Sequence, residues 1–236
     1  NIIFGRVSDD GYTAIVTLSD KFACSLTVYD RNGNYIYNRN CIERIIDVCF
    51  TDDGNGAVLS FVNADNGSIV TKTECIKFDS DNTKWTAEPF DTYCIKSASF
   101  DDGTVVLGDD KCAYYNNSGE ITASYTYDGS FAGCDISGSK AAVILNDNER
   151  HKYNVMLLSG PKKEPFIISY DEELRYVQIY DGLVYVMGKT QLKAFDFSGN
   201  LRSTVDITDS YSQFRRCDKY IFLMSYDRVD RIDFES

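Results

Sequence analysis

The segment Ser99–Lys111, SFDDGTVVLGDDK, places an Asp-Asp-Gly turn before a short apolar run and ends that run at a second acidic turn. Two earlier segments have the same order: VSDDGYTAIVTLSDK begins at Val7 and CFTDDGNGAVLSF begins at Cys49. Asp and Gly suit tight turns, because the carboxylate accepts backbone N–H bonds and Gly tolerates a positive φ. Each segment therefore predicts two antiparallel strands joined by a hairpin, and the recurrence predicts that the strand pair recurs.

Two independent markers show that the repeat runs along the whole chain. Turns that open an apolar run recur at spacings of 43, 49, 36, 43 and 37 residues, at Asp10, Asp53, Asp102, Gly138, Asp181 and Asp218. Polar turns that end an alternating run recur at spacings of 49, 37, 41, 39 and 37 residues, at Asp30, Asp79, Asn116, Leu157, Asp196 and Asp233. A repeat of about 40 residues is the period of a stacked repeat fold.

Each repeat unit reads as four strands: one before the Asp-Gly turn, two alternating runs after it, and a short closing strand such as NYIYN or LRSTV. Four strands in about 40 residues form one blade of a β-propeller. The sequence thus predicts an all-β fold, a six-bladed β-propeller of four-stranded antiparallel blades. The last blade is expected to be incomplete, because DRVDRIDFES ends where other units make their final hairpin. We expect one domain over residues 1–236, with blades at about 1–40, 41–90, 91–127, 128–170, 171–208 and 209–236.

The repeat gives the chain a resemblance to the β-propeller superfamily over its whole length, without a subfamily signature. The only tryptophan, Trp85, is followed by Thr rather than by the Asp of a WD40 blade, and Ser8–Gly11 is one residue too short for a sialidase Asp-box. Blades of the form YD-x-x-G are similar to uncharacterised membrane-anchored propellers of anaerobic Gram-positive bacteria. That resemblance implies an extracytoplasmic protein tethered to the cell membrane by an anchor upstream of Asn1, with a cytoplasmic location as the alternative.

Charge and composition narrow the range of partners. The formal net charge is −12, with 24 basic and 36 acidic side chains, which argues against binding to a nucleic acid backbone. No apolar run approaches the roughly 20 residues of a membrane span, so no membrane insertion is expected within this chain. The eight cysteines include no C-x-x-C pair, and we interpret them as small strand hydrophobes.

Catalytic chemistry has little support in the sequence. The only histidine, His151, lies in the polar stretch NDNERHKYN, where a solvated or structural role is expected. Oxygen-rich stretches such as DSDNTK, from Asp79, lack the spacing of an EF-hand loop. The sequence therefore predicts no catalytic residue, no metal site and no cofactor.

Candidate ligand-binding residues come from the strand before each Asp-Gly turn. Seven residues before each turn, the side chains include the charged residues Asp47, Lys96 and Arg175. Unpaired charges inside a channel are costly, so one interpretation is that these three groups pair with one another across a wet channel. The alternative makes Lys96 and Arg175 a clamp for an anionic ligand, since Arg is a good bidentate donor.

A second candidate surface consists of tyrosines near the start of the first strand of several blades: Tyr93, Tyr127, Tyr170 and Tyr211. Tyrosine is common in protein-binding surfaces because it adds contact area at a small entropic cost. One tyrosine in each blade also fits a repeat-specific packing residue, and both interpretations stay open. Because the stretches SYDEELR and VNADN add negative charge, a protein or cationic partner fits this face better than an acidic one.

We therefore expect a non-catalytic binding or scaffolding propeller that recognises a protein or a small ligand on one face. The alternative is a propeller-type hydrolase or lyase that acts on glycans through carboxylates on the channel face. An enzyme should show carboxylates converging in a concave pocket, with a raised pKa on one of them.

Overall fold

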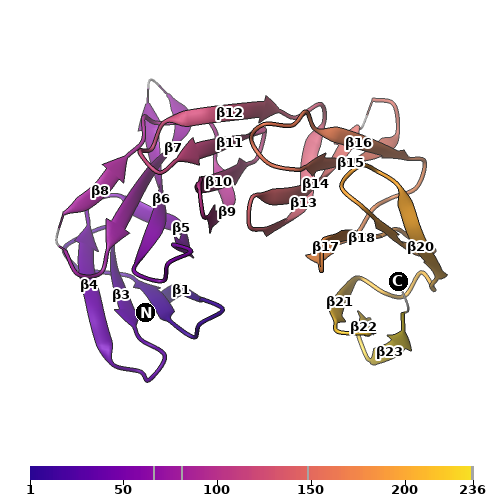
Figure 1. Cartoon of the computed structure of the whole chain (residues 1–236), viewed down its shortest axis with the longest axis horizontal. Coiled ribbons are helices and arrows are strands. Elements are labelled where there is room, and N and C mark those ends of the chain that lie inside the picture. Colours follow the sequence, from indigo (N-terminus) through magenta and orange to yellow (C-terminus); the bar gives the residue numbers. More distant parts are fainter. Residues whose placement is uncertain (66, 81, 148, 235–236) are drawn as a thin grey trace. The chain divides into compact units, whose positions relative to one another are not determined.

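The computed structural model of the chain describes residues 1–65, 67–80, 82–147 and 149–234. The regular secondary structure of these residues consists of β-strands alone, and the strands form six antiparallel sheets (Figure 1). A helix long and apolar enough to cross a membrane does not occur in the described part of the chain. Two compact units, Asn1–Thr126 and Tyr127–Ser236, divide the chain and are described separately.

The first unit contains three four-stranded sheets, which we call blades 1 to 3. The strands are β1 (Ile2–Val7), β2 (Thr13–Thr17), β3 (Cys24–Tyr29) and β4 (Tyr35–Cys41) in blade 1, β5 (Arg44–Phe50), β6 (Gly56–Asp65), β7 (Ser68–Lys77) and β8 (Thr83–Thr86) in blade 2, and β9 (Cys94–Phe100), β10 (Gly103–Gly108), β11 (Lys111–Asn116) and β12 (Ile121–Thr126) in blade 3.

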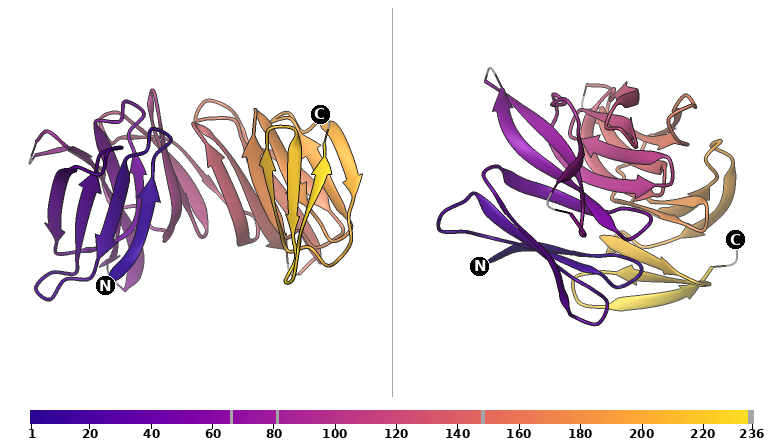
Figure 2. Two further views of the ribbon diagram at one scale, coloured as in Figure 1. Left: turned by 90° about the horizontal axis from the view of Figure 1, so that it is seen from below. Right: turned by 60° about the vertical axis from the view of Figure 1, so that its left-hand side comes forward.

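The second unit contains blades 4 to 6. The strands are β13 (Ser130–Ser137), β14 (Lys140–Asp147), β15 (Lys152–Leu158) and β16 (Phe166–Tyr170) in blade 4, β17 (Tyr176–Tyr180), β18 (Leu183–Met187), β19 (Gln191–Phe195) and β20 (Leu201–Asp206) in blade 5, and β21 (Gln213–Cys217), β22 (Tyr220–Met224) and β23 (Val229–Asp233) in blade 6. Blade 6 has three strands and the other blades have four. Figure 2 gives two further views of the strands. The predicted all-β fold of six blades, the last one incomplete, is confirmed; a single domain over residues 1–236 stays a prediction.

The Asp-Asp-Gly turns join the first and second strands of blades 1 to 3, as the sequence predicts. Gly11 and Gly54 have positive φ values of 85° and 68°, which side chains larger than Gly rarely adopt. At Gly103 the requirement is steric instead, because an added Cβ would overlap the carbonyl oxygen of Tyr115. In blades 5 and 6 the left-handed position is taken by Asp181 and Asp218, with φ values of 47° and 51°.

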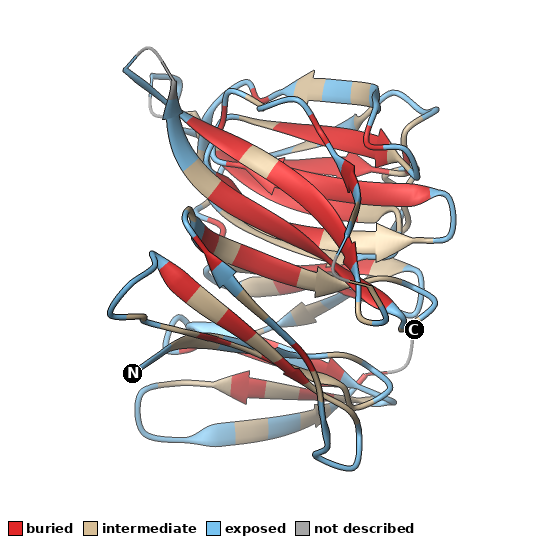
Figure 3. Cartoon of the chain, turned by 90° about the vertical axis from the view of Figure 1, so that its left-hand side faces the viewer, coloured by how far each residue is buried: buried red, intermediate tan, exposed pale blue. Residues whose placement is uncertain are grey.

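Apolar side chains between neighbouring sheets form the cores. One cluster joins blades 1 and 2 and includes Leu26 and Phe61, and another joins blades 2 and 3 and includes Trp85 and Tyr115. In the second unit, corresponding clusters join blade 4 to blade 5 and blade 5 to blade 6. Figure 3 shows buried residues along the strands and exposed residues at the turns. Each sheet alone would leave apolar side chains in water, so the sheets stabilise one another by stacking.

Polar side chains tie the first strands of neighbouring sheets together. The first strand of each sheet pairs with one strand only, so its outer N–H groups need other acceptors. The backbone N–H of Ile179 donates to the carboxylate of Asp135 at 2.8 Å, and that of Arg216 donates to the side-chain oxygen of Gln178 at 2.7 Å. These bonds link β13 to β17 and β17 to β21.

Asp47 makes the same kind of link in the first unit and adds an ion pair. Its Oδ2 accepts bonds from the backbone N–H of Ser97 at 2.7 Å and from the hydroxyl of Ser97 at 2.8 Å. Its Oδ1 accepts from the guanidinium of Arg6 at 2.8 and 3.1 Å. Because the carboxylate is only 1% exposed, this one side chain joins β1, β5 and β9 inside the fold.

Replacing Asp47→Ala should lower the free energy of unfolding of the first unit by about 2–3 kcal/mol, because Ser97 and Arg6 would lose their acceptor. Urea unfolding followed by the fluorescence of Trp85, which lies in this unit, measures the change. Asp102→Ala removes an exposed carboxylate and should change stability by less than about 0.5 kcal/mol. Equal effects of the two substitutions would contradict the structural role of Asp47.

Candidate functional site

The predicted ligand-binding residues Asp47, Lys96 and Arg175 lie on the first strands or directly before them, as expected. The carboxylate of Asp47 is engaged by Arg6 and Ser97 rather than by the other two. Lys96 is half-buried on β9. Arg175 donates to the backbone carbonyls of Asp209 and Tyr211, both at 2.8 Å, and pairs with the Asp209 carboxylate. Lys96 and Arg175 belong to different units, and a ligand-binding role for the three residues stays a prediction from sequence position.

The four predicted tyrosines differ in burial. Tyr93 is 37% exposed, whereas Tyr127, Tyr170 and Tyr211 are each 8% exposed. The ring of Tyr170 packs edge-on against Phe195, and the hydroxyl of Tyr211 donates to Asp230 at 2.6 Å. Three of these rings therefore present little surface to a partner, which favours the packing interpretation for them. A protein-binding role for the set stays a prediction.

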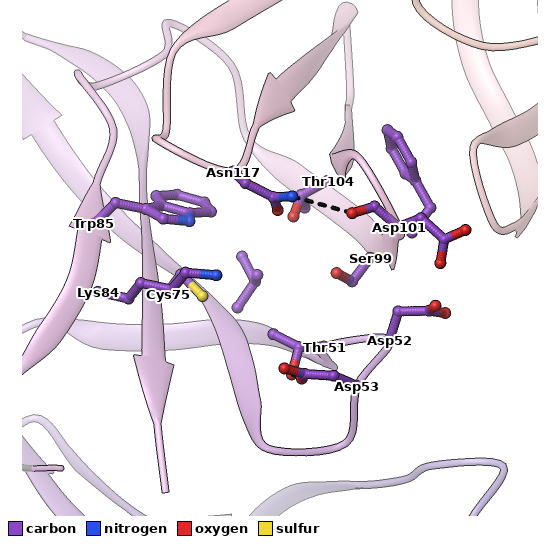
Figure 4. A pocket seen from close by; sticks show the side chains of 12 residues that line it. Thr51, Asp52, Asp53, Cys75, Lys84, Trp85, Ser99, Asp101, Thr104 and Asn117 are labelled. Atoms are coloured by element: carbon purple, nitrogen blue, oxygen red, sulfur yellow. Dashed lines mark hydrogen bonds between the residues drawn. The ribbon is translucent and has the colours of Figure 1, made fainter. Parts of the chain in front are cut away.

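A polar cavity lies between blades 2 and 3, at the end that carries the Asp-Asp-Gly turns (Figure 4). Its volume is about 240 Å³. The β5–β6 turn contributes Asp52 and Asp53, and the β9–β10 turn contributes Asp101. Val58, Cys75 and Trp85 from blade 2 form its apolar wall. The cavity thus combines an acidic rim with an aromatic and aliphatic wall.

Two mostly buried residues present polar groups to this cavity. Thr104 is 2% exposed and Trp85 is 8% exposed, and Figure 4 shows the indole nitrogen turned toward the cavity that Thr104 also lines. Within the described residues, neither the hydroxyl of Thr104 nor the indole N–H is given a hydrogen bond by the protein. A bound group that both donates and accepts hydrogen bonds would satisfy them.

The carboxylates of the rim have different electrostatic environments. The hydroxyl of Thr51, at 2.6 Å, and the backbone N–H of Asn55, at 3.1 Å, donate to Asp53. These bonds lower the pKa of Asp53, and the charge of Lys84 acts in the same direction. Asp52 instead faces Asp101: a hydrogen bond that holds its proton, together with repulsion between the two charges, raises the pKa of Asp52.

The negative charges of Asp52 and Asp101 are therefore not balanced by a neighbouring cation among the described residues. Across the described ranges, neither carboxylate has a cation within ion-pair distance. Lys84 also lines the cavity, and its charge acts on Asp53. An incoming cation would relieve the repulsion between Asp52 and Asp101.

A second cavity, of about 300 Å³, lies on the other side of the same β5–β6 turn, between blades 1 and 2. Gly54 and Asn55 of the turn, Asp79 and the rings of Tyr12 and Phe78 line it. The β5–β6 turn therefore borders both cavities. No group of three or more His, Cys, Asp or Glu side chains is arranged to hold a metal ion among the residues that the structure describes.

The sequence pattern predicted the Asp-Asp-Gly hairpins but not this cavity. A turn motif gives no information about which neighbouring turn it will face, so the pairing of Asp52 with Asp101 requires the blade stacking. One usable signal in the sequence was Trp85. A single tryptophan on a short fourth strand places a large apolar side chain near the surface, and this indicates a pocket around it.

Comparisons with known proteins give a family and a fold. A family model described as a family of unknown function (DUF5711) matches residues 1–234. No curated protein matches the sequence.

Solved structures with a similar fold are β-propellers of low sequence identity. BamB from Moraxella catarrhalis is 11% identical, with a TM-score of 0.62, over 99% of this chain and 75% of that one. Hsv2p from Kluyveromyces lactis is 12% identical, with a TM-score of 0.65, over 98% and 74%. A chain of the mitotic checkpoint complex is 11% identical, with a TM-score of 0.66, over 97% and 72%. At these identities the likeness shows the β-propeller fold alone.

The raised pKa of Asp52 has a consequence for stability. A carboxyl that holds its proton more tightly in the folded state destabilises the fold once it ionises, so the penalty appears as pH rises above about 4 and is absent at lower pH. Asp52→Asn should therefore raise the melting temperature at pH 7 and have no effect near pH 3. Thermal unfolding of both proteins across pH 3–8 measures this difference.

Asp102→Asn is the matched control, because Asp102 is an exposed carboxylate that follows Asp101 and does not line the cavity. It should not reproduce the pH-dependent gain. A loss of stability in Asp52→Asn at pH 7 would contradict the repulsion between Asp52 and Asp101.

Proposed function

We propose that this chain, which belongs to the family of unknown function DUF5711, is a non-catalytic binding propeller that recognises a basic segment of a partner protein. The binding surface is the end of blades 1 to 3 that carries the Asp-Asp-Gly turns. The observation that carries this proposal is a cavity whose rim holds the mutually repelling carboxylates of Asp52 and Asp101 and whose wall presents the indole N–H of Trp85. Such a cavity costs stability in the free protein, and functional sites are where such costs are retained.

The charge of this end supports a basic partner. The three Asp-Asp-Gly turns carry six exposed carboxylates, at Asp9, Asp10, Asp52, Asp53, Asp101 and Asp102. Like charges clustered on one surface attract an oppositely charged partner and raise its association rate. Lysine and arginine side chains would supply the missing cations, whereas an acidic segment would be repelled.

The chemistry of the cavities supports a protein segment rather than a simple ion. The indole N–H of Trp85 needs an acceptor, while the carboxylates need donors. A peptide offers both, through its main-chain carbonyls and its basic side chains. Aromatic walls at Trp85, Tyr12 and Phe78 also favour the aliphatic stems of Lys and Arg, which pack on apolar surface while the charge stays near the rim.

Propellers that resemble this chain include BamB and a chain of the mitotic checkpoint complex, and membership of a complex is consistent with a scaffolding role here.

We also propose, from the sequence resemblance, that the protein acts outside the cytoplasm, tethered by an upstream anchor. Cys217 is exposed, so a membrane-impermeant maleimide should label it in intact cells that express the full-length protein. Labelling only after lysis would place it in the cytoplasm, and Cys217→Ser controls for labelling elsewhere.

Binding of short peptides tests the proposed function. A Lys/Arg-rich peptide should bind at least about tenfold more tightly than a Glu-rich peptide of equal length, because ten-fold corresponds to only about 1.4 kcal/mol of charge complementarity. The affinity should fall as salt rises from 50 to 500 mM. Trp85 fluorescence and calorimetry measure both effects. Replacing Asp52 and Asp101 together by Asn should weaken binding.

Equal binding of the two peptides, or no binding, would contradict a basic partner. The paired carboxylates with one raised pKa also fit the alternative of a glycan hydrolase or lyase. If neither peptide binds and the wild-type protein, but not Asp52→Asn, releases new sugar ends from a polysaccharide, that alternative replaces the binding function.

A further inference from the structure

The chain itself fills an equivalent cavity with an arginine. Between blades 5 and 6, Arg216 on β21 is 6% exposed. Its guanidinium lies 5.9, 5.6 and 5.4 Å from the ring centres of Tyr180, Tyr185 and Phe234. It donates to the carbonyl oxygen of Phe234 at 3.0 Å. This space is an aromatic box that holds a guanidinium by cation–π contacts.

Strand register identifies the equivalent position in blade 3. In blade 6, Cys217 pairs with Tyr220 at the first hairpin and Arg216 pairs with Ile221. In blade 3, Phe100 pairs with Gly103 at that hairpin and Ser99 pairs with Thr104. Ser99 therefore stands where Arg216 stands.

The next strand gives the second equivalence. Ile221 pairs with Ile232 in blade 6, and Thr104 pairs with Tyr115 in blade 3. Two residues further along, Phe234 therefore corresponds to Asn117. Blade 3 thus has a Ser and an Asn where blade 6 has an Arg and a Phe. Both of these residues line the 240 Å³ cavity, at the positions that Arg216 and Phe234 hold within blade 6.

The empty position has the acceptors that a guanidinium requires. A guanidinium has five N–H donors in a plane and no acceptor. Asp52, Asp53 and Asp101 and the hydroxyl of Thr104 line this cavity and offer acceptors; Figure 4 shows Trp85 on the side of the cavity away from Asp52 and Asp101. The indole N–H of Trp85 would then donate to a main-chain carbonyl of the segment that carries the arginine. A lysine ammonium can bridge two carboxylates, as Lys72 does with Glu43 and Glu74, but it is a compact point charge without the planar fork that gives a guanidinium bidentate bonds.

Resting on the proposed function, we propose that the cavity between blades 2 and 3 binds the side chain of an arginine of the partner, in the position that Arg216 occupies between blades 5 and 6. The arginine is the anchor of the recognised segment. Other basic residues of the partner lie along the surrounding carboxylates.

The first experiment compares peptides that differ at one residue. Three otherwise neutral peptides carry Arg, Lys or citrulline at the centre, and Trp85 fluorescence follows their binding. The Arg peptide should bind at least about tenfold more tightly than the citrulline peptide and at least about threefold more tightly than the Lys peptide. Equal affinity for Arg and Lys, or for Arg and citrulline, would overturn the inference.

The second experiment fills the cavity from within. Ser99→Arg places a guanidinium where Arg216 lies in blade 6, and it should abolish binding of the Arg peptide while the protein stays folded by circular dichroism. Ser118→Arg adds the same charge at an exposed turn residue that does not line the cavity, and it should change the dissociation constant by less than about twofold. Retained binding in a folded Ser99→Arg protein would overturn the inference.

Asp101→Asn keeps the test decisive if Ser99→Arg does not fold. Asp101 is exposed on a turn, so this variant should fold and should bind the Arg peptide at least about fivefold more weakly; unchanged binding would overturn the inference. Different results would contradict the arginine anchor and the proposed function. If Lys/Arg-rich peptides bind but the single-Arg peptide shows no preference, only the arginine anchor is wrong. If no basic peptide binds, the proposed function is wrong as well.

Discussion

The stacked sheets depend on how the outer edge of each first strand is satisfied. A strand with a partner on one side only leaves N–H groups that would be buried without acceptors. Side chains of the neighbouring first strand accept hydrogen bonds from these N–H groups: Asp47, Asp135 and Gln178. Apolar packing brings the sheets together without direction, whereas these bonds fix the register between neighbouring first strands. These three side chains therefore have a structural role in the stack.

Because the pairing at the first hairpin is the same in blades 3 and 6, a residue of one blade can be matched to its equivalent in the other. Arg216 is buried in blade 6, and Ser99 at the same position lines a cavity in blade 3. The residues that recur in each blade maintain the stacked sheets, and a residue that differs from the repeat can leave a cavity between two sheets. The cavity retains a repelling pair, Asp52 with Asp101, that a structural role does not require.

The fold was predictable from the sequence because each turn is a local feature. Asp-Asp-Gly and the alternating runs around it specify hairpins, and their spacing specifies six blades, the last of which has three strands in the described residues. The sites were less predictable. Counting back seven residues located Asp47 on β5 correctly, but its partners, Arg6 and Ser97, lie 41 and 50 residues away in the sequence. Contacts between sheets follow from stacking and bulges, which shift the register by a residue and which no local pattern reveals.

The most direct test of the account is a backbone amide NMR titration of the protein with an arginine-containing peptide. The account predicts that the largest shifts fall on the β5–β6 and β9–β10 turns and on Thr104 and Asn117, the residues around the cavity. Shifts of this size on Tyr93, Lys96 and the loops at the opposite end of the strands, with none at the cavity, would contradict it and would move the binding surface to the face first expected from the sequence.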